Sequence, residues 1–241
     1  MGVTGAGIRV IEYALGMPGR RSYNDPCGIA RGLNLVGERW ALLVVRELLL
    51  GPKRFTDLHR GLPTASQNVL SQRLRELEQD GVIRRRKLGP PVGTWVYELT
   101  EWGYDLEPVL AHLGRWGSRA PVTSTAESSA DSLILAMRDL FVSHLAEGMR
   151  GSYELRLGDD RFRAEVADGR IELIRGSAER PDAVVETDVA TLWGLILGEH
   201  RIDDTLRSGH VTLEGDHRAG TRFIDLFRAP PMHGQAVDDP A

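Results

Sequence analysis

ASQNVLSQRLRELEQDGVIRRR, residues 65–86, places two kinds of surface in one short stretch. Its leucines recur at helical spacing, which predicts an amphipathic helix with one buried face: Leu70, Leu74 and Leu77. Polar side chains fall on the opposite face: Gln67, Asn68, Ser71, Gln72 and Arg75. Either Ser66 or Thr64 can cap this helix. Gly81 ends it, and a basic run, Arg84 to Lys87, follows.

The segments on either side predict the rest of a small domain. An apolar helical face runs from Trp40 to Leu48 and stops at Gly51-Pro52. A short helical segment at 57–60 and a Gly-Leu-Pro turn precede the quoted stretch. After it, strand-like runs at 82–88 and 94–99 flank a glycine- and proline-rich connection. A further helix opens at Thr100, with a kink expected at Pro108. This order is that of a winged helix-turn-helix domain.

The chemistry of the polar helix face suits double-stranded DNA. A helix fits the major groove, where amides pair with adenine edges and arginine with guanine, while basic residues of a wing bind phosphates. A polar face can equally be only solvated. The predicted DNA-binding residues are Ser66, Gln67, Asn68, Ser71, Gln72, Arg75, Arg84, Arg85, Arg86 and Lys87.

The net charge of −4 is divided unevenly along the chain. Residues 1–120 hold 17 Lys and Arg against 12 Asp and Glu, a balance of +5. Residues 121–241 hold 13 Lys and Arg against 22 Asp and Glu, a balance of −9. The first half therefore suits a polyanion and the second does not.

The composition of residues 118–130 is small and polar, which indicates a linker between two domains. Beyond it, a helix, five strand-like runs and further helices capped by Asp188 and Asp216 are expected. The predicted class is α+β, with a winged helix-turn-helix domain and a C-terminal α/β domain that has a five-stranded sheet. The predicted boundaries are 1–22 for an N-terminal extension expected to be disordered, 23–117 for the winged helix-turn-helix domain, 118–130 for the linker, 131–228 for the C-terminal domain and 229–241 for a flexible tail.

Residues 27–86 resemble the HxlR-type winged-helix transcription regulators, relatives of the MarR group. The motifs that carry the resemblance are GERW from Gly37, RFTDL from Arg54, VLSQRLRELE from Val69, DGVI from Asp80 and YELT from Tyr97. The resemblance implies a homodimer that binds operator DNA, paired through its first and last helices. These are the Leu33 to Val36 region and the Leu106 to Trp116 stripe, which on sequence alone could also be core.

Residues 179–227 resemble the sterol-carrier-protein type of lipid-binding domain, through PDAVVETD from Pro181, LRSG from Leu206 and VTLEGD from Val211. The resemblance implies a sheet covered by helices, with an apolar tunnel that accepts lipid-like molecules. Plain core packing is the alternative for each apolar side chain. The predicted ligand-binding residues are Met137, Phe141, Leu145, Trp193, Ile196, Phe223 and Phe227.

Cys27 is the only cysteine, so no disulfide within the chain and no thiolate zinc cluster can form. It lies where several HxlR-type regulators carry a sensing cysteine, which makes it a possible redox-sensing residue; a small buried residue is the alternative. No set of residues has the spacing of a known active site or phosphate loop. The sequence predicts no catalytic residue, no metal and no cofactor.

Taken together, these features predict a cytoplasmic DNA-binding transcription regulator that is not an enzyme and has no membrane partner. On family grounds it is expected to be a repressor. Its C-terminal domain is expected to bind an apolar or lipid-like effector. The alternative is a constitutive or architectural DNA-binding protein whose C-terminal domain serves dimerisation or partner binding.

Overall fold

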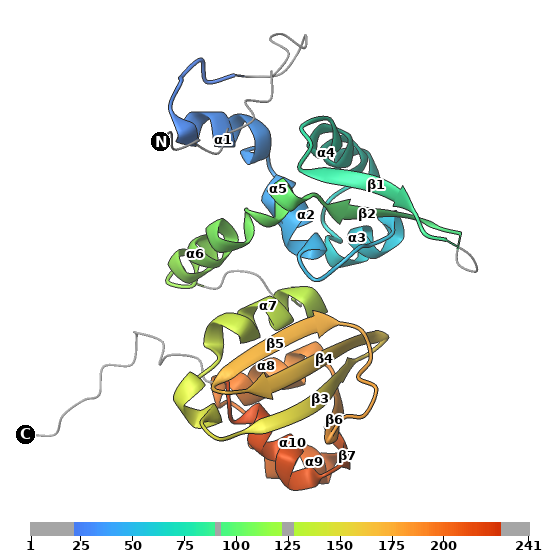
Figure 1. Ribbon diagram of the computed structural model, residues 1–241, viewed down its shortest axis with the longest axis vertical. Coiled ribbons are helices and arrows are strands. Elements are labelled where there is room, and N and C mark those ends of the chain that lie inside the picture. Colours follow the sequence, from blue (N-terminus) through green and yellow to red (C-terminus); the bar gives the residue numbers. More distant parts are fainter. Residues whose placement is uncertain (1–21, 90–92, 122–127, 228–241) are drawn as a thin grey trace, which may run out of the picture. The chain divides into compact units, whose positions relative to one another are not determined.

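The computed structural model describes residues 22–89, 93–121 and 128–227 (Figure 1). The predicted N-terminal extension apart from its last residue, residues 122–127 of the predicted linker, and the predicted tail lie outside these residues. The chain divides into two compact units, with the boundary between Glu38 and Arg39. The first contains one described helix, α1 (Gly28–Val36), and the second contains all the other elements.

The helix-turn-helix consists of α2 (Ala41–Leu48), α3 (Phe55–Gly61) and α4 (Gln67–Gln79). The three leucines at helical spacing in α4 are buried, as their spacing predicts. Ser66 is the N-cap, and its Oγ accepts a hydrogen bond from the Val69 amide at 3.4 Å, which decides between the two predicted caps. Gly81 follows α4 with a φ of +71°, a conformation that glycine adopts without strain.

The wing is an antiparallel hairpin of β1 (Ile83–Lys87) and β2 (Trp95–Leu99). Lys53 forms an isolated antiparallel β-bridge with Tyr97 and so adds one residue to this sheet. Nothing in the sequence indicated this bridge. The Lys53 amide donates to the Tyr97 carbonyl at 3.0 Å, and the Tyr97 amide donates to the Lys53 carbonyl at 2.8 Å. The segment between α2 and α3 therefore holds the wing from one side.

Where a single kinked helix was expected after Thr100, the structure has two helices, α5 (Glu101–Tyr104) and α6 (Glu107–Gly117). Pro108 lies in the first turn of α6, where the missing amide hydrogen costs nothing. Proline thus starts the second helix instead of bending one long helix.

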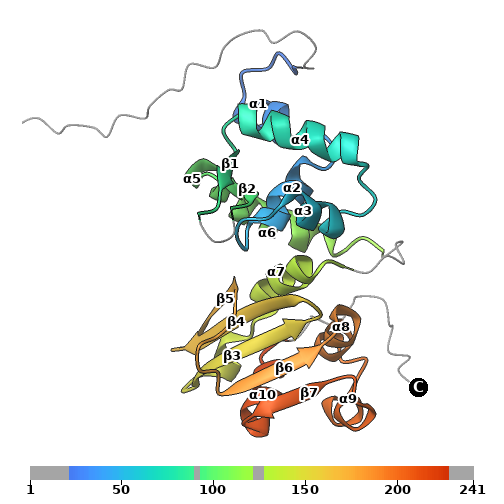
Figure 2. The same ribbon diagram turned by 90° about the vertical axis from the view of Figure 1, so that its right-hand side faces the viewer.

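The C-terminal domain is built on the five-stranded sheet that the sequence predicts, in the order β5-β4-β3-β6-β7 (Figure 2). The strands are β3 (Arg150–Leu157), β4 (Asp160–Ala167), β5 (Arg170–Arg175), β6 (Ala183–Thr187) and β7 (Thr212–Gly215). All neighbouring pairs are antiparallel except β3 with β6. Asp168 and Gly169 both have positive φ and form the tight turn from β4 to β5.

One face of this sheet is apolar and is covered by helices, because alternate residues of β3, β4 and β6 point to the same side. The helices of the domain are α7 (Ala130–Leu140), the 3-10 helix η1 (Ser143–Ala146), α8 (Val189–Leu197), α9 (Ile202–Ser208) and α10 (His217–Ile224). Asp188 caps α8 and Asp216 caps α10, as predicted. The fully buried Phe162 and Phe223 lie at the centre of the core.

Candidate DNA-binding surface and ligand pocket

The predicted reading face of α4 is open to solvent. Gln67, Asn68, Gln72 and Arg75 are exposed, as is the cap Ser66, while Ser71 is half-buried. The Arg75 Nε donates to the Ser71 carbonyl at 3.3 Å, and the Gln72 amide donates to Glu76 Oε1 at 3.0 Å. Both contacts are exposed and local, so the two side chains can be redirected to base edges at small cost.

The basic residues of β1 divide between the two faces of the wing. Arg84 and Arg86 both bind the nearly buried carboxylate of Glu98, with Arg84 Nε at 2.7 Å and Arg86 Nη2 at 2.8 Å. The hydrogen bond from Arg86 lowers the pKa of Glu98, which burial alone would raise. Glu98 therefore fixes these two guanidiniums and offsets part of their positive charge.

Arg85 faces the other side of the wing, against aromatic rings. Its guanidinium lies 4.6 Å from the ring centre of Trp95 and 6.0 Å from that of Tyr97. The Trp95 side chain is 49% exposed. Lys87 lies opposite Trp95 in the hairpin, so this face offers cations together with an aromatic surface to a polyanion.

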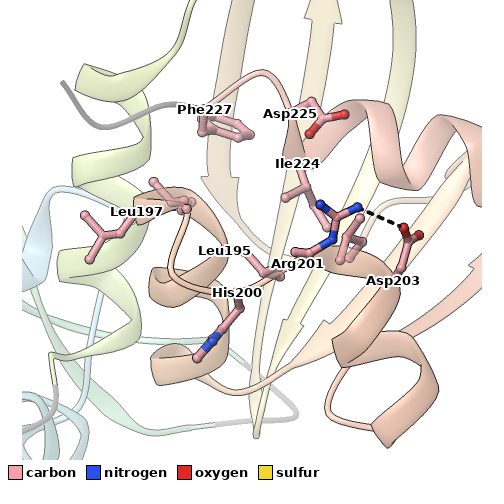
Figure 3. Close-up of a pocket in the computed structure, with 11 residues that line it drawn as sticks. Leu195, Leu197, His200, Arg201, Asp203, Ile224, Asp225 and Phe227 are labelled. Carbon is pink, nitrogen blue, oxygen red and sulfur yellow. Dashed lines mark ion pairs between the residues drawn. The ribbon is translucent and has the colours of Figure 1, made fainter. Parts of the chain in front are cut away.

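A pocket of about 360 Å³ lies in the C-terminal domain between the end of α8, α9 and the end of α10 (Figure 3). Six apolar side chains contribute to its lining: Leu195, Ile196, Leu197, Ile202, Ile224 and Phe227. His200, Arg201, Asp203 and Asp225 add polar groups, and Arg201 pairs with Asp203 at 3.8 Å. The exposed lining is therefore mixed, with polar and apolar atoms in almost equal share, and the pocket is partly open to solvent.

The structure gathers the seven predicted ligand-binding residues into one apolar cluster, but only Ile196 and Phe227 line this pocket. Met137 and Phe223 are buried, and Phe223 stacks on Tyr153 with ring centres 4.4 Å apart. Phe141, Leu145 and Trp193 are half-buried and pack against the cluster. The predicted set as a whole stays a prediction.

Sequence reasoning did not single out the polar groups of the pocket. His200 and Arg201 belong to the connection between α8 and α9, which Gly198 opens with a left-handed φ of +75°. The Glu199 and His200 amides donate to the Gly194 carbonyl at 2.8 and 3.1 Å, which fixes the direction of that connection. A glycine followed by polar residues after a helix was the signal that could have indicated this loop.

Cys27 is exposed, and it is the N-cap of α1: its Sγ accepts from the Ala30 amide at 3.3 Å. The redox-sensing role of Cys27 stays a prediction. Within the described residues, no group of three His, Cys, Asp or Glu side chains is arranged to hold a metal ion. The same residues contain no helix with the length and apolar character needed to cross a membrane.

Comparison with known proteins assigns both halves of the chain. The profile of the HxlR-like helix-turn-helix family matches residues 35–124. The Bacillus subtilis transcriptional regulator YdeP is 39% identical over 97 residues, which are 39% of this chain and 74% of YdeP. YvaP of the same organism is 35% identical over 88 residues, 36% of this chain and 82% of YvaP.

The chain belongs to the HxlR-like helix-turn-helix family.

The crystal structure of the regulator YtcD is also similar, with 37% identity and a TM-score of 0.36 over 38% of this chain and 94% of YtcD. Residues 138–228 match the SCP-2 sterol transfer family, so an HxlR-like DNA-binding domain is joined to an SCP-2 domain. YdeP and YvaP are named as transcriptional regulators, not as enzymes, in agreement with the prediction.

Proposed function

We propose that this HxlR-like protein is a homodimeric repressor whose SCP-2 domain binds an apolar or lipid-like effector that changes operator affinity. The observation that carries the proposal is the pocket at the ends of α8 and α10, partly lined by apolar side chains, in the same chain as an exposed helix-turn-helix face. A ligand switches the protein only if it binds the DNA-competent and incompetent forms with different affinities.

The recognition face of α4 is tested by Arg75→Ala, which removes an exposed guanidinium able to bind guanine with two hydrogen bonds. The free-energy difference between specific and non-specific DNA binding is expected to fall by about 1–3 kcal/mol. Competition binding at two salt concentrations, with an operator selected from random DNA by the wild-type protein, measures this ratio. The double variant Gln67→Ala with Asn68→Ala is expected to act in the same direction.

The matched control is neutralisation of Arg85 and Lys87, the two cations on the face of the wing that does not carry Glu98. Both are predicted to bind phosphates, so their loss should weaken all sequences alike and flatten the dependence of affinity on salt. The opposite result, a wing variant with altered sequence preference and a helix variant without it, would reverse the assignments. The wing would then contact bases, and α4 would contact phosphates.

The effector site is tested by Leu197→Asp. Leu197 lines the pocket and is 42% exposed, so a carboxylate there can stay hydrated and the fold is expected to be kept. When an apolar ligand fills the pocket, it takes water away from this carboxylate, which costs several kcal/mol. Binding of a dansyl-labelled fatty acid, followed by fluorescence, is therefore expected to be lost, whereas Leu197→Met should retain it.

Operator affinity without ligand should be the same in Leu197→Asp as in the wild type, since Leu197 belongs to α8 of the SCP-2 domain and is none of the predicted DNA-binding residues. In the wild type, the fatty acid should change operator affinity about five- to 150-fold, the range of typical couplings. Tight fatty-acid binding without any such change would favour the alternative, a constitutive or architectural DNA-binding protein.

A further inference from the structure

Lys53 is in contact with both the wing and the SCP-2 domain. Its backbone forms the two hydrogen bonds to Tyr97 that hold β2. Its side chain is only 9% exposed, and the Nζ binds Glu47 Oε2 at 2.6 Å and contacts the carboxylate of Asp131. One residue thus fixes the position of the wing and binds the first turn of α7.

Four further side chains surround this contact and, with Lys53, form what we call the interdomain joint: Glu47, Ser129, Asp131 and Arg175. Ser129 Oγ donates to Glu47 Oε1 at 2.7 Å. Arg175, from β5, binds Asp131 and also binds Asp160 at 2.5 Å. Leu50, which precedes Lys53 by three residues, belongs to the buried core cluster of the C-terminal domain. The segment after α2 therefore contacts the C-terminal domain through the ionic joint and also through the apolar side chain of Leu50.

The other end of α7 reaches the pocket. Phe141 follows the helix and pairs with Phe227 through a single β-bridge, with ring centres 6.1 Å apart. The Val142 amide donates to the Leu226 carbonyl at 2.8 Å. Phe227 is one of the residues that line the pocket. A helix of 11 residues is a stiff rod about 16 Å long, so a shift at one end reaches the other.

We propose that α7 transmits occupancy of the pocket to the wing, through the contact of Asp131 with Lys53. This rests on the proposed function, since it assumes that a ligand enters the pocket. A ligand that displaces Phe227 also moves Phe141 and, with it, helix α7. The contact of Asp131 with Lys53 at the other end of α7 then changes, because the attraction between buried charges depends on their distance in a low-dielectric site. Lys53 then shifts Tyr97 and the face of the wing that carries Arg85 and Trp95.

The test is Asp131→Asn in the full chain. The variant is expected to fold because each cation keeps another carboxylate: Lys53 keeps Glu47, and Arg175 keeps Asp160. The joint also borders a pocket of about 340 Å³, from which water can reach the new amide. Asp131→Ala is the second variant if the amide proves poorly tolerated. The matched control is Asp160→Asn, which removes a carboxylate from the same ion cluster but leaves the contact of Asp131 with Lys53 intact.

Hydrogen exchange at the Lys53 and Tyr97 amides gives a readout that needs no ligand. Both amides are expected to exchange roughly fivefold faster or more in Asp131→Asn, which is the lower end of the range for coupling between two sites. In Asp160→Asn their exchange rates are expected to be unchanged. Equal protection in Asp131→Asn and wild type would overturn the proposal. So would faster exchange in both variants, which would show only a loss of general stability.

The second readout is operator binding with and without the dansyl-labelled fatty acid. Asp131→Asn should bind the fatty acid as the wild type does, yet show no change in operator affinity, while Asp160→Asn keeps the full response. A response of wild-type size in Asp131→Asn overturns the transmission route. If the wild type itself binds no fatty acid, the proposed effector fails, and the exchange measurement still decides whether the joint holds the wing.

Discussion

Replacing Leu113 with aspartate is expected to convert the protein into a monomer and to lower operator affinity by about 10²- to 10⁴-fold, the avidity lost when two linked sites become one. Leu113 lies on α6 in a stripe with Val109 and Trp116, and the three side chains are 44%, 52% and 71% exposed. No residue of α6 is buried, so the stripe is not core of the described chain. A second copy of the same helix face can cover it, because a two-fold axis pairs identical surfaces.

The measurement is sedimentation of the wild type and Leu113→Asp, together with their binding to the selected operator. The control is Arg115→Asp, which places the same carboxylate about 200° away around the helix, off the stripe. Footprinting of the wild type should show half-sites about one helical turn, roughly 10 bp, or a multiple apart. A Leu113→Asp protein that remained a dimer would place the dimer contact elsewhere, for example on α1, where Ile29 and Leu33 are also exposed.

Local signals in the sequence were sufficient to predict the recognition helix and the sheet. Each depends on neighbours along the chain: the leucine spacing of α4, its hydroxyl cap, and the glycine that allows the turn of Asp168 and Gly169. Alternation along β3 and β4 likewise places Tyr153, Leu155 and Phe162 in the core. Periodicity specifies which face of an element is buried, so the fold class followed from it.

The lining of the pocket could not be predicted in the same way, because periodicity does not distinguish a side chain in the core from one at a cavity wall. Phe223 and Phe227 are both buried on the same segment, yet only Phe227 lines the pocket. The interdomain joint was also beyond prediction. Lys53 and Asp131 are far apart in the sequence, and charged residues are seldom buried, so nothing local indicated their contact.

Glu47→Ala is expected to lower the free energy of unfolding by about 3 kcal/mol, the lower part of the range for removing one partner from a buried ion pair. Glu47 is fully buried, binds Lys53 and Arg46, and accepts a hydrogen bond from Ser129. Its removal leaves the buried Nζ of Lys53 with Asp131 alone and takes the ion partner from Arg46. Denaturant unfolding of the full chain measures the loss. The control is Glu186→Ala, since Glu186 pairs with Arg156 at 3.6 Å but is 53% exposed, and such surface pairs contribute about 0–1 kcal/mol.

The loss in Glu47→Ala should depend on pH. Burial by itself would raise the pKa of Glu47, but the charges of Lys53 and Arg46 and the hydrogen bonds from Lys53 and Ser129 lower it below its ordinary value. A carboxyl whose folded pKa is lowered stabilises the protein fully above its unfolded pKa, and this contribution is lost as the pH falls through the folded pKa. The difference between wild type and Glu47→Ala is therefore expected to shrink in acid.

Burial raises the pKa of the neighbouring Asp131, so the stability of the wild type alone mixes two opposite dependences on pH. The difference between wild type and variant reports Glu47 together with its coupling to Asp131, because the charge of Glu47 also helps to raise the pKa of Asp131. If the difference in the free energy of unfolding stayed the same from about pH 7 to about pH 3, the ionic role of Glu47 would be contradicted. A group that titrates in this range with different pKa values in the folded and unfolded states must make stability depend on pH. The contribution of Glu47 to stability would then come from packing against Gly61. The two residues are so close that a Cβ atom added to Gly61 would lie only 2.1 Å from Glu47 Oε2.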